Sequence, residues 1–521
     1  MWIIILFSLI CLIQHVYTNQ IVTVQTSYGT VQGYETDLCR VFYGIPYAQP
    51  PVGLLRWSEP VAIGSWASST IDGTQIPPAC PQSACDANDI LCPKSMSEDC
   101  LYMNIFTPLN SVSSNLPVMI FIHGGNFQYS SASIAPYNAD RFVNTTNVIS
   151  VFIQYRLGIL GFLAKNTSSN DLKGNYGLLD QQMAIAWVKS NINTFGGDPN
   201  KITLFGQSAG AQSTAIHYLR PEMQQYFQAA IIQSCPVTIP FRTYNQYLIP
   251  NILLAQQLNC IFGDISCLRA CSYQSIIAAQ NVINSQITSL QSLQYFEPWT
   301  PVIDNNIVRG QIFNMFSNIF VQAKPLIIGT MTEEALSYVY SAFPNSVSPL
   351  GYIAAGTLLF GSKFVIIALK YPPQGLGDQR PLLAKLVTQW VFACPTRFIA
   401  RKVNAFTYAF GYPLHTNGLI NAGACEAHAC HGFDLAFLFE AFWLNSTAND
   451  QYISQTMANY WTNYAKTKNP NNPVLVPVTW TQLGANPEKY LYFQNPVQII
   501  TNYLKSDCDF WDTIGYSNTL V

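Results

Sequence analysis

The sequence predicts an α/β fold in which a large, mostly parallel, doubly wound sheet carries helices on both faces, with a small antiparallel hairpin near the N-terminus. The apolar run at residues 118–122 has no polar alternation, as expected of a strand buried on both faces of a parallel sheet. From residue 148 to residue 205, patterns typical of strand, loop, helix and strand follow one another. This order implies right-handed crossover connections, which place helices on both faces of the sheet.

The other elements agree with this fold. Alternating residues at 21–31 predict the hairpin. The remaining predictions are strands at 148–155, 201–205, 229–233, 325–328 and 405–410, and helices at 180–194 and 211–219. A chain of 521 residues with 49% hydrophobic content can bury a large core, so we expect residues 19–521 to form a single domain.

Residues 1–18 are typical of a secretory signal peptide. Their apolar run is too short to span a bilayer, and Val16 and Thr18 are acceptable before a cleavage point. Because no Lys or Arg precedes the run, an uncleaved anchor is the alternative. No later segment has a continuous apolar run of about 18 residues, the length that indicates a span, and residues 513–521 form neither a lipid-attachment tail nor an ER-retention signal. We therefore expect a mature chain without a membrane span, secreted or in the lumen of secretory vesicles.

Composition fits that location. Thirteen of the fourteen cysteines follow the signal, which is more than a cytosolic enzyme would keep reduced, so we expect disulfides. Three sequons, at Asn144, Asn166 and Asn445, are candidate glycosylation sites. The net charge of −2 and the 10% content of charged residues give no basic surface for nucleic acid. We expect no cofactor, and Cys–His metal binding is disfavoured because the spacing provides no second ligand pair.

The segment Gly206-Gln207-Ser208-Ala209-Gly210 stands between a predicted strand and a predicted helix. A serine nucleophile needs this arrangement, because a strand that turns sharply into a helix requires small flanking residues. The hydroxyl of Ser208 then lies at the tip of the turn, near the positive end of the helix dipole. A G-x-S-x-G match also occurs in ordinary loops, and the flanking strand and helix are what favour a nucleophile here.

The segment His123-Gly124-Gly125-Asn126-Phe127 directly follows the strand predicted at 118–122. Successive glycines past a strand end let backbone N–H groups approach a ligand oxygen closely, as a developing oxyanion requires. A plain Gly-Gly turn is the alternative, and this segment alone does not decide between the two.

Seven ordered motifs run along the chain: Ile45-Pro46-Tyr47-Ala48, Ser97-Glu98-Asp99-Cys100-Leu101-Tyr102-Met103-Asn104, the glycine loop at 123–127, Tyr155-Arg156-Leu157-Gly158, Gly174-Asn175-Tyr176-Gly177-Leu178-Leu179-Asp180-Gln181, Phe195-Gly196-Gly197-Asp198-Pro199 and the elbow at 206–210. With them the sequence resembles the type-B carboxylesterase and cholinesterase family of α/β-hydrolases, over about residues 22–515. The low charge and the Cys-His-Gly segment at 430–432 also resemble the slime-mould crystal proteins. The resemblance implies an α/β-hydrolase that cleaves carboxylic esters.

The resemblance selects the partners of Ser208, which spacing alone leaves ambiguous. The family uses glutamate as its catalytic acid, and Glu334 matches it, with Glu333 as the competing candidate. His431 matches the catalytic histidine, and the order Ser, Glu, His is that of α/β-hydrolases. The other histidines fit less well, because one lies on the helix of the nucleophile and two lie in predicted loops: His217, His415 and His428.

The resemblance places an oxyanion hole at the backbone N–H groups of Gly125, Asn126 and Ala209, with Gly124 providing the turn of the loop. Asn126 replaces a small residue of the family pattern. We expect its side chain to crowd the pocket or its backbone to take an unusual angle.

Two further departures concern charge and choline recognition. Gln207 replaces the glutamate that usually precedes the serine, which removes a negative charge from the pocket. The loop at 81–99 lacks the tryptophan with which cholinesterases bind a quaternary ammonium, so we expect no preference for choline esters.

The resemblance also proposes the disulfides Cys80–Cys100, Cys260–Cys267 and Cys394–Cys508. Cys425 and Cys430 flank the histidine loop and are expected to pair, and Cys85–Cys92 is a weaker candidate. Three cysteines are left, so at least one stays free or pairs between molecules: Cys39, Cys235 and Cys271.

We expect aromatic side chains to line the substrate cleft. Phe127 and Tyr129 stand near the oxyanion loop, and Tyr295, Phe296 and Trp299 precede Pro301-Val302-Ile303-Asp304. For the last three, ordinary core packing has equal weight.

The resemblance therefore implies a secreted serine hydrolase that cleaves a small-molecule ester through an acyl-enzyme intermediate. A non-catalytic storage or crystal-forming protein of the secretory lumen and an adhesion protein on the same fold are the alternatives. Adhesion members have typically lost a triad residue, whereas Ser208, Glu334 and His431 are all present. The sequence leaves open the acyl and alcohol preference, esterase versus lipase activity, and the oligomeric state.

Overall fold

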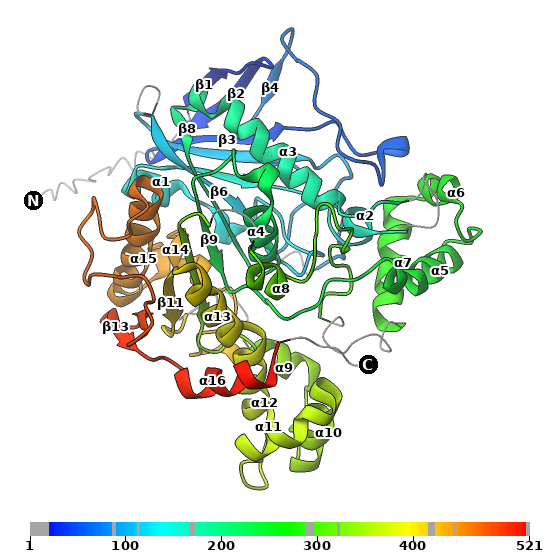
Figure 1. Cartoon of the computed structure of the whole chain (residues 1–521). Helices are drawn as coiled ribbons and strands as arrows, with labels where there is room; N and C mark the ends of the chain where they lie inside the picture. The colour runs from blue at the N-terminus through cyan, green and yellow to red at the C-terminus, as the bar shows by residue number, and fades with distance from the viewer. Residues whose placement is uncertain are drawn as a thin grey trace, which may run out of the picture.

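One mixed sheet crosses the molecule in the computed structural model, which describes residues 20–85, 90–111, 115–165, 172–286, 296–319, 323–414, 423–441 and 443–516 (Figure 1). Within these residues the sheet has thirteen strands in the order β1-β2-β3-β5-β7-β6-β8-β9-β10-β11-β12-β13, and β4 pairs with β2. The strands are β1 (Gln20–Gln25), β2 (Thr30–Glu35), β3 (Cys39–Pro46), β4 (Thr70–Asp72), β5 (Tyr102–Pro108), β6 (Leu116–Ile122), β7 (Ile149–Ile153), β8 (Gly197–Gln207), β9 (Ala229–Gln233), β10 (Leu326–Met331), β11 (Phe406–Phe410), β12 (Lys489–Phe493) and β13 (Gln498–Thr501).

The centre of the sheet is parallel and its two edges are antiparallel. Strands β7, β6, β8, β9, β10, β11 and β12 pair in parallel. On one side β1, β2, β3 and β5 continue the sheet antiparallel, and on the other side β13 does so. The predicted α/β fold with an N-terminal hairpin is confirmed. The carboxyl ends of β6, β8 and β10 therefore lie at one edge, where α/β proteins place their sites.

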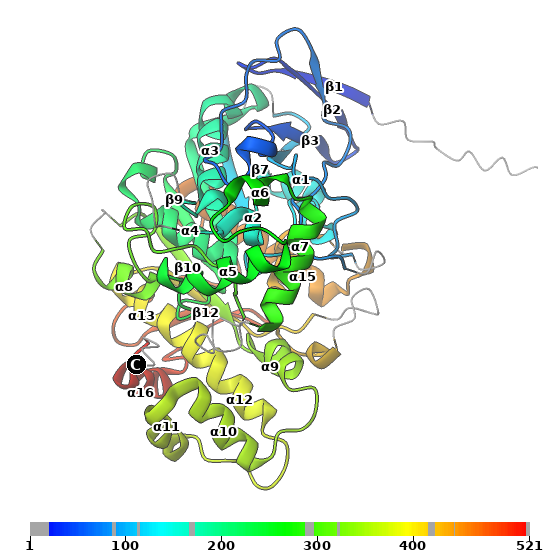
Figure 2. The same ribbon diagram turned by 90° about the vertical axis from the view of Figure 1, so that its right-hand side faces the viewer.

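Helices cover both faces of the sheet (Figures 1 and 2). They are α1 (Asp140–Thr146), α2 (Gly158–Phe162), α3 (Tyr176–Asn191), α4 (Ala209–Leu219), α5 (Leu248–Gln257), α6 (Ile265–Ala270), α7 (Tyr273–Gln286), α8 (Ile312–Ser317), α9 (Leu336–Ala342), α10 (Pro349–Phe360), α11 (Phe364–Lys370), α12 (Arg380–Val387), α13 (Cys394–Val403), α14 (Asp434–Leu438), α15 (Ala448–Thr467) and α16 (Lys505–Ile514). A π-helical segment, η9 (Thr388–Ala393), joins α12 to α13.

Alternate residues of the central strands divide between two cores. Ile120 of β6 packs in one core with Ala215 of α4, whereas Phe121 packs in the other with Trp461 of α15. Side chains of successive strand residues point to opposite faces, so a strand covered on both faces must be apolar throughout. The uninterrupted apolar run at 118–122 has this cause.

A lobe of helices lies at one end of the molecule, formed by α10, α11 and α12 (Figures 1 and 2). It contains Pro349–Lys370, the one candidate membrane span that length and apolar character identify in the described part of the chain. Gly361 has a φ of 58° and divides this stretch into α10, of 12 residues, and α11, of 7 residues. A span needs about 20 consecutive residues, and neither helix has that length alone.

Five disulfides link the described residues: Cys80–Cys100, Cys85–Cys92, Cys260–Cys267, Cys394–Cys508 and Cys425–Cys430. They include the three pairs that the resemblance proposed, the pair expected beside the histidine loop and the weaker candidate Cys85–Cys92. Among the cysteines of the described residues, three are free: Cys39, Cys235 and Cys271. Of the candidate glycosylation sites, Asn144 is exposed on α1 and Asn445 ends a short helix at Trp443–Asn445. Asn166 and the predicted signal at 1–18 lie outside the described residues.

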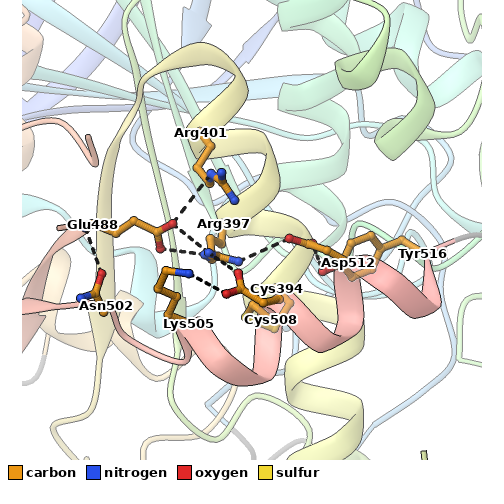
Figure 3. Close-up of polar contacts among 10 residues, drawn as sticks. Cys394, Arg397, Arg401, Glu488, Asn502, Lys505, Cys508, Asp512 and Tyr516 are labelled. Atoms are coloured by element: carbon orange, nitrogen blue, oxygen red, sulfur yellow. Dashed lines mark hydrogen bonds and ion pairs between the residues drawn. A yellow bond between two sulfur atoms is a disulfide. The ribbon is translucent and has the colours of Figure 1, made fainter. Parts of the chain in front are cut away.

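The C-terminal helix α16 is attached to α13 by a disulfide and by ion pairs (Figure 3). Cys394 of α13 bonds to Cys508 of α16. One turn further along α13, the buried Arg397 donates to the buried Glu488 at 2.7 Å and to Asp509 of α16 at 2.7 Å. The disulfide and the ion pairs therefore hold α16 against α13.

Candidate active site

Ser208 lies in a strained turn between β8 and α4. It has a φ of 59° and a ψ of −127°, a conformation that side-chain-bearing residues rarely adopt. Its backbone N–H donates to the carbonyl of Gln233 at 3.0 Å, which ties the turn to the neighbouring strand β9. A Cβ on Gly210 would lie 2.0 Å from the carbonyl oxygen of Ile122, so only glycine fits there. The sequence pattern and the local geometry therefore agree on a nucleophile elbow.

The glycine loop after β6 lies against this turn. A Cβ on Gly124 would lie 2.9 Å from the Cβ of Ser208. In the described residues the N–H groups of Gly125, Asn126 and Ala209 donate to no protein acceptor. Three unbonded amides next to a serine hydroxyl form a set of donors for an oxyanion.

The loop turns at a different residue from the one expected. We expected Gly124 to provide the turn, but the left-handed angles occur at Gly125, with a φ of 98°, and at Asn126, with a φ of 55°. Gly124 instead allows the loop to approach the elbow closely. The unusual angle expected for Asn126 is present, and asparagine tolerates it better than most residues because its short side chain can bond locally.

Glu334 and His431 form a hydrogen-bonded pair. Glu334 follows β10, is fully buried, and accepts from the Met331 N–H at 2.8 Å through Oε1. Its Oε2 lies 2.5 Å from Nδ1 of His431. A bridge between Glu333 and Cys430 brings the two segments together. Because the carboxylate accepts from Nδ1, Nε2 carries the lone pair that a general base needs.

The amide of Gln207 occupies the other nitrogen of His431. Its Nε2 lies 3.1 Å from Nε2 of His431, and within the described residues no hydrogen bond joins His431 to the hydroxyl of Ser208. The imidazole lies between two aromatic rings, with centroid distances of 5.4 Å to Tyr338 and 5.3 Å to Phe392. The sequence showed Gln207 only as a missing charge, because its contact with a residue 224 positions away depends on the fold.

The competing acid and the other histidines lie outside this arrangement. Glu333 pairs with His428 at 2.7 Å, and both side chains are more than one-third exposed. His217 is buried and contacts Gln181 at 3.0 Å, and burial lowers the pKa of its imidazole. His415 lies outside the described residues. Glu334 is therefore the acid that contacts His431.

Two cavities adjoin Ser208 and the oxyanion loop. The inner cavity, of about 370 Å³, is lined by Ser208 and by mostly apolar residues. The outer cavity, of about 1070 Å³, is lined by polar and apolar residues, Tyr129 among them. Both are lined by Asn126, Phe296 and Tyr338, so these three residues stand between them. The space next to Ser208 can hold a small apolar group.

The aromatic predictions are correct in part. Phe296 lines both cavities and Tyr129 lines the outer one. Phe127 and Trp299 are fully buried and line neither of these cavities. Phe127 packs on Phe162, and the indole N–H of Trp299 donates to Asn284. These two rings fill the core, as large aromatic side chains commonly do. Tyr295 lies outside the described residues.

Sequence reasoning missed one acidic residue of the inner cavity. Glu297 is 1% exposed, and burial raises the pKa of its carboxyl group to about 8, while a hydrogen bond from Gln212 acts in the opposite direction. The signal in the sequence was a single acid inside the run Phe296-Glu297-Pro298-Trp299. Among all the described residues, no group of three or more His, Cys, Asp or Glu side chains is placed to hold a metal ion.

Comparisons with known proteins point to one family. A model of the carboxylesterase family matches residues 20–352 and 366–511. The cAMP-regulated D2 protein of Dictyostelium discoideum is 34% identical over 505 residues, which cover 95% of this chain and 93% of that protein. The crystal protein of the same organism is 34% identical over 506 residues, which cover 94% of this chain and 90% of that protein. Among solved structures, that of a PNB esterase is similar with a TM-score of 0.80 and 28% identity, covering 95% of this chain and 100% of that chain.

Proposed function

The chain belongs to the carboxylesterase family, and from this premise we propose that it is a secreted serine hydrolase that cleaves carboxylic esters through an acyl-enzyme intermediate. Ser208, His431 and Glu334 form its triad. One observation carries the proposal: the hydrogen bond between Glu334 and His431 at 2.5 Å, formed beside a strained serine and three unbonded amides. The five disulfides support secretion, because such bonds persist in oxidising compartments.

The proposed reaction has two halves. Nε2 of His431 takes the proton of Ser208 as its oxygen attacks the ester carbonyl, and then gives that proton to the leaving alcohol. Glu334 holds the tautomer and stabilises the imidazolium. Water then repeats the sequence on the acyl-enzyme and releases the acid. During attack the Ser208 hydroxyl replaces the Gln207 amide at Nε2.

The oxyanion in each half is bound by the amides of Gly125, Asn126 and Ala209. These donors are fixed before the substrate arrives, so no energy is spent on orienting them as charge develops. Removal of one such donor typically lowers the rate by about 10²–10³.

Ester hydrolysis by matched variants tests this function. The substrates are p-nitrophenyl esters from acetyl to long acyl. We expect Ser208→Ala to lower kcat by about 10⁶ and Glu334→Gln by about 10⁴, with Glu333→Gln within about threefold of the unmodified protein as the control. A preference for short chains indicates an esterase, whereas interfacial activation on long chains indicates a lipase. Equal rates for the unmodified protein and Ser208→Ala would refute the proposal.

One observation favours a second candidate, a non-catalytic protein on the same fold. Nε2 of His431 is bonded to Gln207 and not to Ser208, and one relative is named a crystal protein. A storage, crystal-forming or adhesion protein would need no serine–histidine contact. Such a protein would hydrolyse none of the esters in the series.

A further inference from the structure

A buried acid lies in the inner cavity with one oxygen unsatisfied. Glu297 lines the same cavity as Ser208. Its Oε2 accepts from Nε2 of Gln212 at 3.1 Å, whereas its Oε1 has no hydrogen-bond partner among the described residues. Most of the remaining lining is apolar: Pro236, Ile239, Phe296, Val387, Val391 and Phe392. An unpaired polar oxygen in such surroundings carries the full cost of desolvation, and a substrate group that pairs with it removes that cost.

The groups around Glu297 leave it neutral at pH 7. Burial raises the pKa of its carboxyl group to about 8. The groups that interact with it come from two helices and from two loops that follow strands: Gln212 of α4, Tyr338 of α9, Tyr155 after β7, and Cys235 after β9. Burial also raises the pKa of the Tyr338 and Tyr155 phenols and of the Cys235 thiol, so all of these neighbours are uncharged. A neutral carboxyl group both donates and accepts hydrogen bonds.

The inner cavity is the place for the acyl group. The acyl group stays bonded to Ser208 after the alcohol leaves, so it needs a cavity that contains Ser208 and stays occupied between the two halves of the reaction. The alcohol needs an exit, which the larger outer cavity provides. The inner cavity, which includes Glu297, is smaller than the outer one, so we expect it to hold a short acyl chain.

We propose that Glu297 is a specificity-determining residue, which hydrogen-bonds a hydroxyl or oxo oxygen on a short acyl chain. The proposal rests on the proposed function, and it names the substrate class of the same site: esters of short hydroxy or oxo acids. Because Oε2 accepts from Gln212, the proton of the neutral carboxyl group lies on Oε1, and this O–H donates to the oxygen of the acyl chain. An unsubstituted acyl chain leaves Oε1 unpaired, and such a mismatch lowers kcat/KM.

Matched esters measure this discrimination. The p-nitrophenyl esters of butyrate, 2-hydroxybutyrate, 3-hydroxybutyrate and 3-aminobutyrate are compared at pH 6. We expect the unmodified protein to prefer the better hydroxy ester over butyrate by about 10–100-fold in kcat/KM, since one buried hydrogen bond is gained. Glu297→Gln keeps a donor and an acceptor and should retain part of the preference. Glu297→Leu should lose it, so that its kcat/KM values for the hydroxy esters and for butyrate differ by less than about threefold.

A binding measurement separates this proposal from the proposed function. The amides of butyrate and of the hydroxybutyrates are not rapidly hydrolysed, and their effect on Tm is measured with the unmodified protein, Glu297→Gln and Glu297→Leu. Larger stabilisation by a hydroxy amide in the unmodified protein, lost in Glu297→Leu, supports the role of Glu297 even if no ester is cleaved. Ester cleavage with equal selectivity in all three proteins overturns it, as does a preference for the 3-amino ester. Absence of both cleavage and selective binding overturns both proposals.

Discussion

At the scale of single residues, the ability of His431 to act as a base depends on which group bonds to its Nε2. In this structure that group is the Gln207 amide, at 3.1 Å. Catalytic hydrogen bonds in substrate-free sites are often long or misaligned and shorten in the substrate complex. We therefore expect the Ser208 hydroxyl to replace the Gln207 amide at Nε2 when a substrate binds.

Replacing Gln207 by glutamate changes the pH dependence of hydrolysis. A carboxylate at this position favours the charged imidazolium and therefore delays its conversion to the base. We expect Gln207→Glu to move the acidic limb of the kcat/KM profile upward by about 1–2 pH units. The profile is measured with a neutral short-chain ester between pH 5 and 9. An unshifted profile would mean that residue 207 does not contact His431 in the working enzyme.

Glu297 should make stability fall as pH rises. The pKa of its carboxyl group is about 8 in the folded chain and near the ordinary 4.5 in the unfolded chain. Between these values the unfolded state loses the proton and the folded state retains it, so stability decreases from pH 4.5 to pH 8 and is constant above. The contribution is about 3–5 kcal/mol. Relative to Glu297→Gln, the unmodified protein should lose this amount between pH 5 and 8 in chemical denaturation, and parallel curves would contradict the assignment.

Residues that lie in sequence motifs can be found from the sequence, whereas residues whose role depends on burial cannot. Ser208, Glu334 and His431 could be proposed as a triad, because each lies in a short segment that matches the family resemblance. Glu297 could not, because its importance comes from an unpaired oxygen in an apolar cavity, and both features depend on distant residues. Trp299, two residues away, illustrates the same limit: cleft and core were equally weighted predictions for it, and the residue is in the core.

At the scale of elements, the contact between α13 and α16 depends on one arginine (Figure 3). Arg397 is 2% exposed, and its guanidinium contacts three carboxylates, on Glu488, Asp509 and Asp512. Glu488 is buried to the same degree. A buried carboxylate without its arginine costs several kcal/mol of folding free energy. Loss of the arginine alone therefore destabilises the protein more than loss of both charges.

Arg397→Met should destabilise the protein by about 3–5 kcal/mol, because it leaves Glu488 buried and uncompensated. The matched control is Arg401→Met, whose guanidinium is half-exposed and 3.8 Å from Glu488, and we expect a loss below about 1 kcal/mol. Adding Glu488→Gln to Arg397→Met should recover most of the loss. Denaturation curves that coincide for the two arginine variants would exclude this role.

Helices and strands could be predicted where a single periodic pattern of apolar residues marks them. The strand at 118–122 and the hairpin at 21–31 are confirmed, because burial on both faces and alternation leave distinct signatures. The helix predicted at 180–194 begins earlier, at Tyr176, and its last residues, from Ile192, form a 3-10 helix. The π-helical segment η9, which supplies Val391 and Phe392 to the inner cavity, has no such signature.

At the scale of the whole molecule, parallel strands gather the site. Residues of the oxyanion loop, the elbow and the acid follow β6, β8 and β10, whose carboxyl ends share one edge of the sheet. The Cys425–Cys430 disulfide closes the short loop that directly precedes His431. Chain segments more than two hundred residues apart therefore meet at one cavity. The order of the motifs and the resemblance together could predict this meeting. The division of the space into two cavities could not be predicted.

Covalent labelling at Ser208 tests the central claim most directly. The protein is incubated with an organophosphonate, and the adduct is counted by intact mass and located by peptide mapping in the unmodified protein, Ser208→Ala and His431→Asn. We predict one adduct per chain on Ser208, absent from Ser208→Ala and formed far more slowly in His431→Asn. A protein that forms no adduct, or an adduct that persists in Ser208→Ala, would contradict the account.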